Sequence, residues 1–142
     1  MSKKFSVVIN NKIKKFRKTI IVDNDKSISQ RALLIASQCI GPSSLKGVLE
    51  SEDVKNTILC LRKLGVKILK KNKKYIVYGN GLGSFRKPHK NMLYAGNSGT
   101  LARMIIALLA TDPNLKVKIS GDDSLNKRDM KRIIEPLSKI GC

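Results

Sequence analysis

The chain alternates short apolar runs with longer segments in which apolar residues recur three or four positions apart. The longer segments predict amphipathic helices, and the short runs, rich in Ile, Val and Leu, predict strands. Helices are expected at 27–40, 51–65 and 97–109, with a fourth that follows position 120 and extends to 141. Strands are expected at 19–22, 45–48, 66–69, 75–78, 92–95 and 116–120. The alternation of the two kinds predicts an α/β fold.

Residues that favour helix ends and turns lie at the boundaries of these elements. Gly41-Pro42 is expected to close the first helix, and Gly65 to cap the second. Ser51-Glu52-Asp53 is expected to start the second helix, because acidic groups in a first turn interact favourably with the helix dipole. The lysine run 70–74 lies between two predicted strands and is expected to form a solvated hairpin turn.

The order of elements restarts in the second half of the chain. Residues 53–66 (DVKNTILCLRKLGV) align with residues 129–142 (DMKRIIEPLSKIGC), with Asp, Lys, Leu and Gly at matching positions. A long repeat at an offset of about 70–76 residues indicates a supersecondary unit, here β-α-β-α-β-β, that is used more than once. Pro136 falls inside the second copy and predicts a helix that is kinked or begins late.

The second copy stops at Cys142, whereas the first copy continues into two strands. A sheet edge would be left unpaired, so we interpret the chain as a fragment of a longer protein. A decayed piece that never folds stably is an alternative interpretation, because an open edge and half a core leave little margin of stability.

Composition and charge restrict the class of protein. The 142 residues are 42% hydrophobic and 27% charged, and no apolar run is long enough to span a bilayer. The N-terminus lacks a signal-peptide pattern, so a cytoplasmic location is expected. The formal net charge of +19 fits a nucleic-acid binder, a site for phosphorylated or carboxylated small molecules, or a lysine-rich surface without specific meaning. Aromatic residues make up only 4% of the chain, which leaves few side chains for stacking bases.

The cysteines and the histidine do not indicate a metal centre. Cys39 and Cys60 fall within apolar helical patterns and are expected to be buried thiols in a reducing compartment, and Cys142 is far from both. His89 lies in a polar loop without a second His or Cys at ligand spacing. We therefore expect no metal site.

Positively charged residues lie at the start of the first predicted helix. In DKSISQRALL, Lys26 is expected just outside the first turn and Arg31 one turn further in. Ser27 and Ser29 are expected to cap the helix or to donate to a ligand oxygen. A helix N-terminus exposes unpaired N–H groups and a partial positive charge, so the stretch predicts an anion site.

Two further junctions repeat this arrangement. GNSGTLARM combines a glycine-rich turn, through which a backbone can approach a ligand, with Arg103 one turn into the helix. GDDSLNKRDM places Lys127-Arg128 immediately before a helix. Loops after strands are where α/β proteins gather ligands, so three such corners indicate a site for anionic small molecules. The spacings fit neither a P-loop nor a dinucleotide-binding glycine motif.

At these residues the sequence resembles the EPSP synthase (3-phosphoshikimate 1-carboxyvinyltransferase) family. The matching motifs, in order, are DKSISQRALLIAS, LESEDVKNTILCLRKLGV, AGNSGTLARMIIALLA and SGDDSLNKRDMKRIIEPLSKIG. The resemblance covers essentially the whole chain but only about the first third of a family member. It implies two similar domains, each an inside-out α/β barrel of three βαβαββ repeats. Residues 1–21 would form a strand segment that crosses to the other domain. Residues 22–142 would form an incomplete first domain, with about two of the three repeats and the second cut short.

The resemblance also implies a reaction and its site. The enolpyruvyl group of phosphoenolpyruvate passes to the 5-hydroxyl of shikimate 3-phosphate through a tetrahedral intermediate, with release of phosphate and without metal or organic cofactor. The family is usually monomeric, and neither nucleic acid nor a membrane is an expected partner. The residues implied to bind shikimate 3-phosphate are Lys26, Ser27 and Arg31; those implied to bind phosphoenolpyruvate are Lys26, Gly99 and Arg128, with Asn97, Thr100 and Arg103 in support.

Some positions depart from the family pattern. Asp23-Asn24 replaces Pro-Gly, Gln30 stands where His or Asn is usual, and Asp129 replaces a proline. The acidic catalytic residues of the family match no position of this chain, so no catalytic base is expected in it. The isolated polypeptide is therefore expected to lack activity and to need the missing part of the enzyme.

Two other functions remain as alternatives. The sister family that transfers enolpyruvate to UDP-N-acetylglucosamine begins with a Lys-Asn pair where Lys26-Ser27 stands here, which argues against it. A basic nucleic-acid-binding module would bind DNA in a salt-sensitive manner and would be indifferent to shikimate 3-phosphate.

Overall fold

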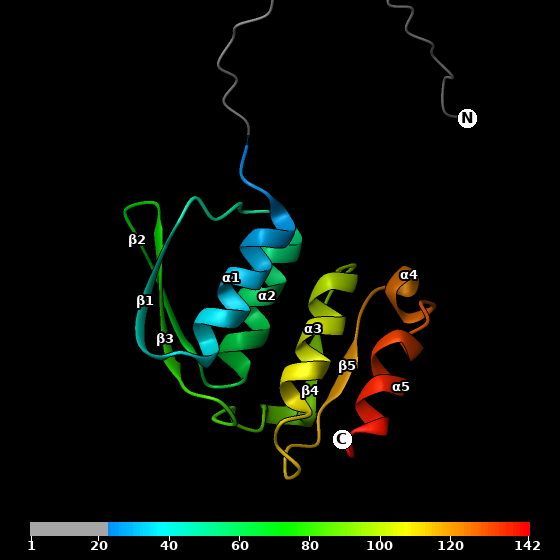
Figure 1. Ribbon diagram of the computed structural model, residues 1–142. Helices are drawn as coiled ribbons and strands as arrows, with labels where there is room; N and C mark the ends of the chain where they lie inside the picture. The colour runs from blue at the N-terminus through cyan, green and yellow to red at the C-terminus, as the bar shows by residue number, and fades with distance from the viewer. Residues whose placement is uncertain (1–22) are drawn as a thin grey trace, which may run out of the picture.

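The computed structural model describes residues 23–142, which form two units side by side (Figure 1). In the first unit, two helices cover one face of a three-stranded antiparallel sheet with the strand order β1-β3-β2. The helices are α1 (Lys26–Gln38) and α2 (Glu52–Lys63), and the strands are β1 (Ile40–Lys46), β2 (Lys67–Lys71) and β3 (Lys74–Asn80).

The second unit begins with the short helix η1 (His89–Asn91). Strands β4 (Met92–Tyr94) and β5 (Lys118–Ser120) pair in parallel, and α3 (Gly99–Leu109) connects them. Helices α4 (Asp123–Asn126) and α5 (Lys131–Lys139) follow. Because α3 also contacts α1, the two units share one hydrophobic core. The α/β class predicted from the sequence is confirmed, and the order helix, strand, helix occurs in both units, as α1-β1-α2 and as α3-β5 followed by α4 and α5.

The apolar stripe of the second helix is buried as its periodicity predicts. Val54, Ile58, Leu61 and Leu64 are all at most 5% exposed, and they face α1 and the sheet. Gly65 has a φ of +90° directly after this helix, and the N–H of Val66 donates to the carbonyl of Leu61. This is the left-handed C-terminal cap expected of a glycine.

The first helix and the first strand differ from their predicted bounds. The helix ends at Gln38, and β1 begins at Ile40 rather than at 45. The prediction that Gly41-Pro42 closes the helix is wrong, because both residues lie within β1. Because β1 is an edge strand with no neighbour on its outer side, it tolerates Pro42, which has no N–H to donate.

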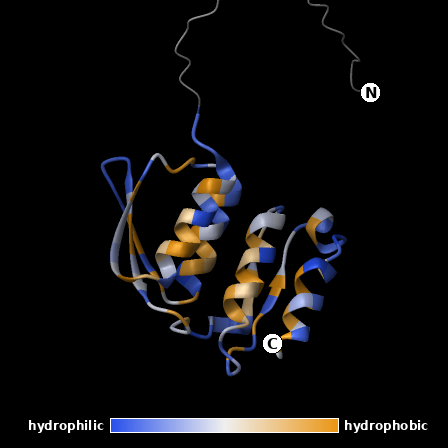
Figure 2. Cartoon of the chain, in the orientation of Figure 1, coloured by the Kyte–Doolittle hydropathy of each residue, from blue (hydrophilic) through white to orange (hydrophobic). Residues whose placement is uncertain are grey.

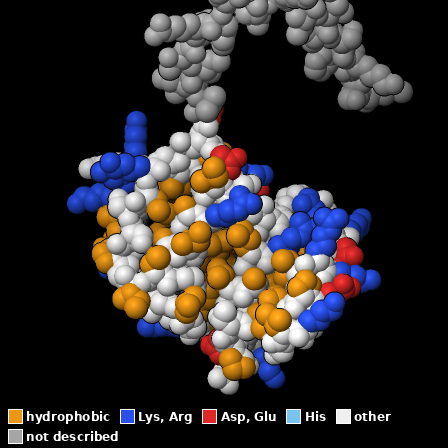
Figure 3. All heavy atoms as spheres, viewed as in Figure 1, with side chains coloured by type: hydrophobic (Ala, Val, Ile, Leu, Met, Phe, Trp, Pro, Cys, Tyr) orange, Lys and Arg blue, Asp and Glu red, His pale blue; other side chains and the backbone are white. Residues whose placement is uncertain are grey.

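The lysine run forms the predicted hairpin turn between β2 and β3. Asn72 and Lys73 have φ values of 46° and 60°, the left-handed conformations that a two-residue hairpin turn requires. Figure 2 shows the tip of this hairpin as hydrophilic. Figure 3 shows Lys and Arg gathered there and again around α4 and α5, with hydrophobic side chains across the face between them.

The fourth predicted helix is preceded by a separate helical turn that was not predicted from the sequence. A single turn, α4, ends at Asn126, and α5 begins only at Lys131. The side chain of Asp129 accepts a hydrogen bond from the N–H of Lys131 at 2.7 Å, which favours a helix start at that point. By the repeat alignment α5 begins three positions later than α2, so the expected late start is confirmed, with Pro136 inside α5.

Several predictions fall on residues outside the described part of the chain. The strand expected at 19–22 and the crossing segment 1–21 both lie there, so they remain predictions. Within residues 23–142, no helix is long and apolar enough to cross a membrane.

The expectation for the cysteines holds at one position only. Cys60 is 2% exposed, and its Sγ lies 3.3 Å from the carbonyl oxygen of Tyr94. Cys39 is exposed, because α1 ends one residue before it. Burial raises the pKa of the Cys60 thiol to about 11.

The thiols are therefore expected to react at different rates. At pH 8, a disulfide reagent should modify the exposed Cys39 and Cys142 quickly and Cys60 only after unfolding, because the thiolate is the reactive form. Mass spectrometry of timed reactions measures the order. Rapid modification of Cys60 in the folded chain would contradict the burial described here.

Candidate functional site

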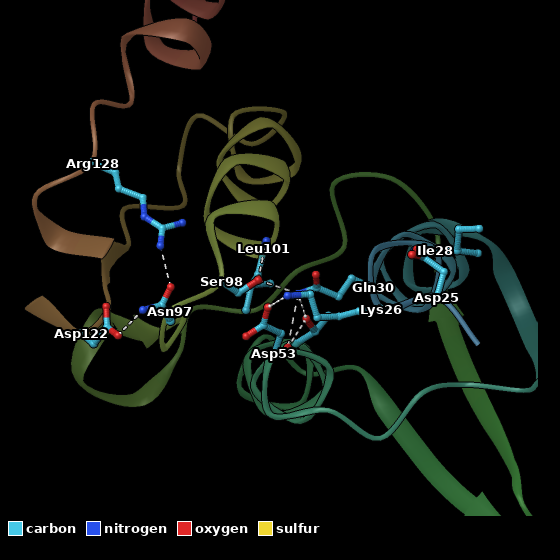
Figure 4. Close-up of polar contacts among 11 residues, drawn as sticks. Asp25, Lys26, Ile28, Gln30, Asp53, Asn97, Ser98, Leu101, Asp122 and Arg128 are labelled. Carbon is cyan, nitrogen blue, oxygen red and sulfur yellow. Dashed lines mark hydrogen bonds and ion pairs between the residues drawn. The ribbon is translucent and has the colours of Figure 1, made fainter. Parts of the chain in front are cut away.

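The N-termini of α1, α2 and α3 lie at the same end of the molecule, the upper end in Figure 1. Short polar contacts join them: Lys26 of α1 reaches Asp53 of α2, and Gln30 of α1 reaches Ser98, which caps α3 (Figure 4). Unpaired N–H groups and the positive ends of three helix dipoles are thereby directed toward one region.

Asp25, and not a serine, caps α1. Its carboxylate accepts a hydrogen bond from the N–H of Ile28 at 2.6 Å. Lys26 is then the first helical residue, so the prediction that it lies outside the first turn is wrong. Ser29 is buried; its hydroxyl donates to the carbonyl of Asp25 and accepts from the N–H of Leu49. The predicted ligand role of Ser29 is wrong, because its hydroxyl is used within the protein.

The ammonium of Lys26 pairs with Asp53 across the gap between α1 and α2. Its Nζ lies 2.8 Å from Asp53 Oδ2, and the two side chains are 49% and 18% exposed. Ser27 is half-buried in the first turn of α1, and Arg31 is exposed one turn further on. The ion pair holds Lys26 toward α2 while half of its surface stays open to a ligand.

The start of α3, residues 96–103, is called the α3 corner, and its backbone requires a glycine at its first position. Gly96 has a φ of +60°, and a Cβ there would lie 2.3 Å from Asn56 Nδ2, so a larger residue is excluded. Ser98 follows as the N-cap, and its Oγ accepts from the N–H of Leu101 at 3.1 Å. Gly99, the first residue of α3, is buried.

Two guanidinium groups converge on Gly99. A Cβ placed on this glycine would lie 3.0 Å from Arg128 Nη1 and 3.6 Å from Arg103 Nη1. Arg103 also has a buried Nε without a partner in the described part of the chain. Two planar cations beside a helix N-terminus suit a phosphate or a carboxylate.

Arg128 is held in place by a chain of hydrogen bonds (Figure 4). Its Nη2 donates to Asn97 Oδ1 at 2.6 Å, and Asn97 Nδ2 donates to Asp122 Oδ2, also at 2.6 Å. Asp122 Oδ1 accepts from the N–H of Leu125 at 2.7 Å and so caps α4. The pKa of Asp122 is lowered, first by this backbone hydrogen bond and further by Asn97 and Arg128.

The third predicted corner differs from the other two. Arg128 stands shortly before α5, as predicted, but it follows the single helical turn α4 and not a strand. Its guanidinium reaches the N-terminus of α3. The structure brings together Asn97, Gly99, Arg103 and Arg128 in one group, and Lys26 with Asp53 in a second.

Gln30 stood out in the sequence only as a departure from the family pattern, and no role was assigned to it. It is completely buried and reaches both α2 and α3. Its position offered a signal, because a polar residue stood within a helix whose neighbours Leu33 and Leu34 are apolar. A buried amide of this kind is normally hydrogen-bonded to other elements.

Three carboxylates of this region have partners within the protein. Asp53 pairs with Lys26, Asp122 accepts from Asn97 and Leu125, and Asp25 caps α1. The chemistry that this arrangement can perform is the binding and charge stabilisation of anions. Within residues 23–142, no three His, Cys, Asp or Glu side chains lie close enough together to hold a metal ion.

Comparison with known proteins identifies the family. The profile of EPSP synthase (3-phosphoshikimate 1-carboxyvinyltransferase) matches residues 10–142. The chain belongs to the EPSP synthase family. A 3-phosphoshikimate 1-carboxyvinyltransferase of Syntrophomonas wolfei is 44% identical over 134 residues, which are 94% of this chain and 31% of the relative. One of Synechocystis is 42% identical over 122 residues, which are 85% of this chain and 27% of the relative.

Solved structures agree with this membership. An EPSP synthase from Acinetobacter baumannii is similar with a TM-score of 0.75 and 34% identity, over 87% of this chain and 28% of that one. The predicted class, an incomplete α/β fold of the EPSP synthase kind, is confirmed. The chain spans about 30% of the length of these EPSP synthase relatives.

The hydrogen bonds of Asp122 predict its titration. A carboxyl whose pKa is lowered by folding stabilises the folded form at every pH above its ordinary pKa. This contribution is lost as the pH falls through the lowered pKa of the folded form. The carboxyl ¹³C signal of Asp122 should therefore titrate with a midpoint below 3.8, its ordinary value. Asn97→Ala should raise that midpoint, because it removes one of the hydrogen bonds. A midpoint at or above 3.8 in the unsubstituted chain would contradict the geometry.

Proposed function

We propose that this chain supplies part of the substrate site of a 3-phosphoshikimate 1-carboxyvinyltransferase. In that reaction the enolpyruvyl group of phosphoenolpyruvate is transferred to the 5-hydroxyl of shikimate 3-phosphate, with release of phosphate, on the route to chorismate and the aromatic amino acids. The observation that carries the proposal is the convergence of Arg128 and Arg103 on Gly99, beside the helix corner that holds Lys26. A cytoplasmic location and a monomeric state remain predictions.

The α3 corner suits phosphoenolpyruvate, a small molecule with one phosphate and one carboxylate. The N–H groups of the first turn of α3 can bind one anionic group, and the forked guanidinium of Arg128 can bind two oxygens of another. Asn97 keeps that guanidinium over Gly99 by accepting its hydrogen bond at 2.6 Å. Thr100 and Arg103 lie in the first turns of the same helix and support the same ligand.

The start of α1, with Lys26, Ser27 and Arg31, is the α1 corner, and it suits shikimate 3-phosphate. Ser27 and Arg31 are one turn apart on α1, so a hydroxyl donor and a guanidinium lie on one side of the helix. Lys26 stands between the corners and would touch both substrates. Binding two anions side by side reduces the entropic cost of their reaction, and the cations offset the repulsion between them.

Turnover tests the proposal in an enzyme that contains the rest of the fold. Residues 10–142 of this chain would replace the matching segment of the Syntrophomonas wolfei relative, and we call the product the grafted enzyme. Phosphate release that requires both phosphoenolpyruvate and shikimate 3-phosphate is the expected result. A folded but inactive graft would contradict the proposal, as would duplex DNA binding that is steeply salt-dependent and indifferent to shikimate 3-phosphate.

The 142-residue chain by itself is expected to show no phosphate release. The acidic catalytic residues of the family match no position of this chain, and the carboxylates of Asp53 and Asp122 are held by Lys26, by Asn97 and by a backbone N–H. The same phosphate assay, run at high chain concentration, measures this. Activity of the purified chain would contradict the assignment of proton transfer to groups outside it.

Substitution of Gly99 tests how closely the ligand approaches the backbone. In Gly99→Ala the added methyl would lie 3.0 Å from Arg128 Nη1, so both the guanidinium and the ligand must shift. The KM for phosphoenolpyruvate in the grafted enzyme should rise about tenfold, the effect of roughly 1.4 kcal/mol. The KM for shikimate 3-phosphate and the melting temperature should change little, because alanine is well tolerated in a helix. Equal effects on both substrates would contradict a specific role in phosphoenolpyruvate binding.

A further inference from the structure

We propose that Gln30 is a positioning residue that fixes the α1 corner relative to the α3 corner. The inference rests on the proposed function, because it assigns the two corners to two substrates. Gln30 would touch neither substrate. It acts through Ser98 and through the first turn of α2.

The hydrogen bonds of Gln30 determine the orientation of its amide (Figure 4). Nε2 lies 2.7 Å from Ser98 Oγ, 3.0 Å from Thr57 Oγ1 and 3.3 Å from the carbonyl oxygen of Asp53. The amide has two hydrogens, so the two shorter contacts are its main hydrogen bonds. Thr57 uses its own hydrogen to donate to the Asp53 carbonyl at 2.9 Å, which leaves its oxygen free to accept from Gln30.

Each partner of Gln30 adjoins a residue of the candidate site. Ser98 caps α3 by accepting a hydrogen bond from the N–H of Leu101, and Ser98 directly precedes Gly99. Thr57 and Asp53 lie one turn apart on α2, and the carboxylate of Asp53 holds Lys26. One side chain of α1 is thereby tied to the start of α3 and to the helix that orients the lysine.

The burial of Gln30 supports a role beyond filling space. It is 0% exposed, and its Oε1 has no hydrogen-bond partner within residues 23–142. An unpaired buried oxygen is costly, and an apolar side chain of the same length would avoid that cost. The amide is therefore explained by its donor contacts, which an apolar residue cannot make.

Gln30→Met tests the inference in the grafted enzyme, because methionine has the same length and no amide. The KM for phosphoenolpyruvate should rise about tenfold with little change in kcat, since the α3 corner is no longer held at its distance from Lys26. Gln38→Met is the matched control. Gln38 is the last residue of the same helix, and among residues 23–142 its Nε2 donates only to Ser37 Oγ. Its replacement should leave both constants within about twofold.

A double variant separates positioning from general destabilisation. If Gln30 acts through Ser98, Gln30→Met should have little further effect on the KM in a Ser98→Ala background. In the 142-residue chain, hydrogen exchange of the Leu101 amide should be faster in Gln30→Met than in Gln38→Met, because Ser98 Oγ is its acceptor.

The outcomes distinguish the inference from the proposed function. An unchanged KM in Gln30→Met, additive effects in the double variant, or equal exchange at Leu101 in both single variants would overturn the positioning role. An unsubstituted grafted enzyme without turnover would overturn the proposed function, and the exchange of Leu101 would still decide whether Gln30 holds the start of α3.

Discussion

Replacing Lys26 by methionine in the grafted enzyme is expected to lower kcat/KM for both substrates, each by about a hundredfold. A hydrogen bond to a charged group contributes roughly 1.5–3 kcal/mol, and the proposed site gives Lys26 one such contact with each substrate. The loss is enlarged because Asp53, only 18% exposed, is left as an unpaired negative charge beside two anionic ligands.

Lys63→Met is the matched control for this substitution. Lys63 is the last residue of α2, at the opposite end of the helix from Asp53, and it is exposed. Both variants lose one positive charge, so a general effect of net charge on the approach of anions would appear in each. Steady-state kinetics with each substrate varied in turn measures the difference. A Lys26→Met enzyme that keeps its affinity for either substrate would contradict the placement of the lysine between them.

Replacing Arg128 is expected to weaken the binding of phosphoenolpyruvate more than the binding of shikimate 3-phosphate. Arg128→Lys keeps the charge but loses the planar fork and the hydrogen bond to Asn97, so the KM for phosphoenolpyruvate should rise about tenfold. Arg128→Ala should raise it about a hundredfold, because the charge over Gly99 is removed as well. The KM for shikimate 3-phosphate should change much less in both variants.

Arg132→Ala serves as the control, since Arg132 is an exposed arginine four positions later, in the first turn of α5. Binding of phosphoenolpyruvate to each variant by calorimetry provides a measurement that does not depend on turnover. If Arg128→Ala and Arg132→Ala weaken binding equally, the effect is one of net charge, and the specific contact proposed here is wrong.

The two corners differ in how rigidly they hold their cations. Arg128 is fixed through Asn97 to Asp122, which also caps α4, so the arginine cannot move without breaking a chain of hydrogen bonds. Lys26 is half exposed, and its contact with the part of the chain that the structure describes is the ion pair with Asp53. An arriving anion can therefore draw Lys26 away from Asp53 more easily than it can displace Arg128.

The sequence by itself determined those features that depend on neighbouring residues. Helical spacing located the buried stripe of α2, and Gly65 marked its end. The lysine-rich turn between two apolar runs indicated the β2–β3 hairpin. The order of the motifs was enough to identify the family, because that order can be read from the chain without knowledge of contacts.

Only the tertiary structure decided which groups face one another. Ser29 is excluded from the candidate ligands because its hydroxyl donates to the carbonyl of Asp25 and accepts from the N–H of Leu49, a residue 20 positions away. The sequence placed Arg128 just before a helix, but only the structure showed that its guanidinium lies beside Gly99 of α3. Gln30 gained its role from Thr57 and Ser98, which are 27 and 68 positions away in the chain. Local sequence determines helices, caps and turns, whereas hydrogen bonds between elements distant in the chain form only when the core brings those elements together.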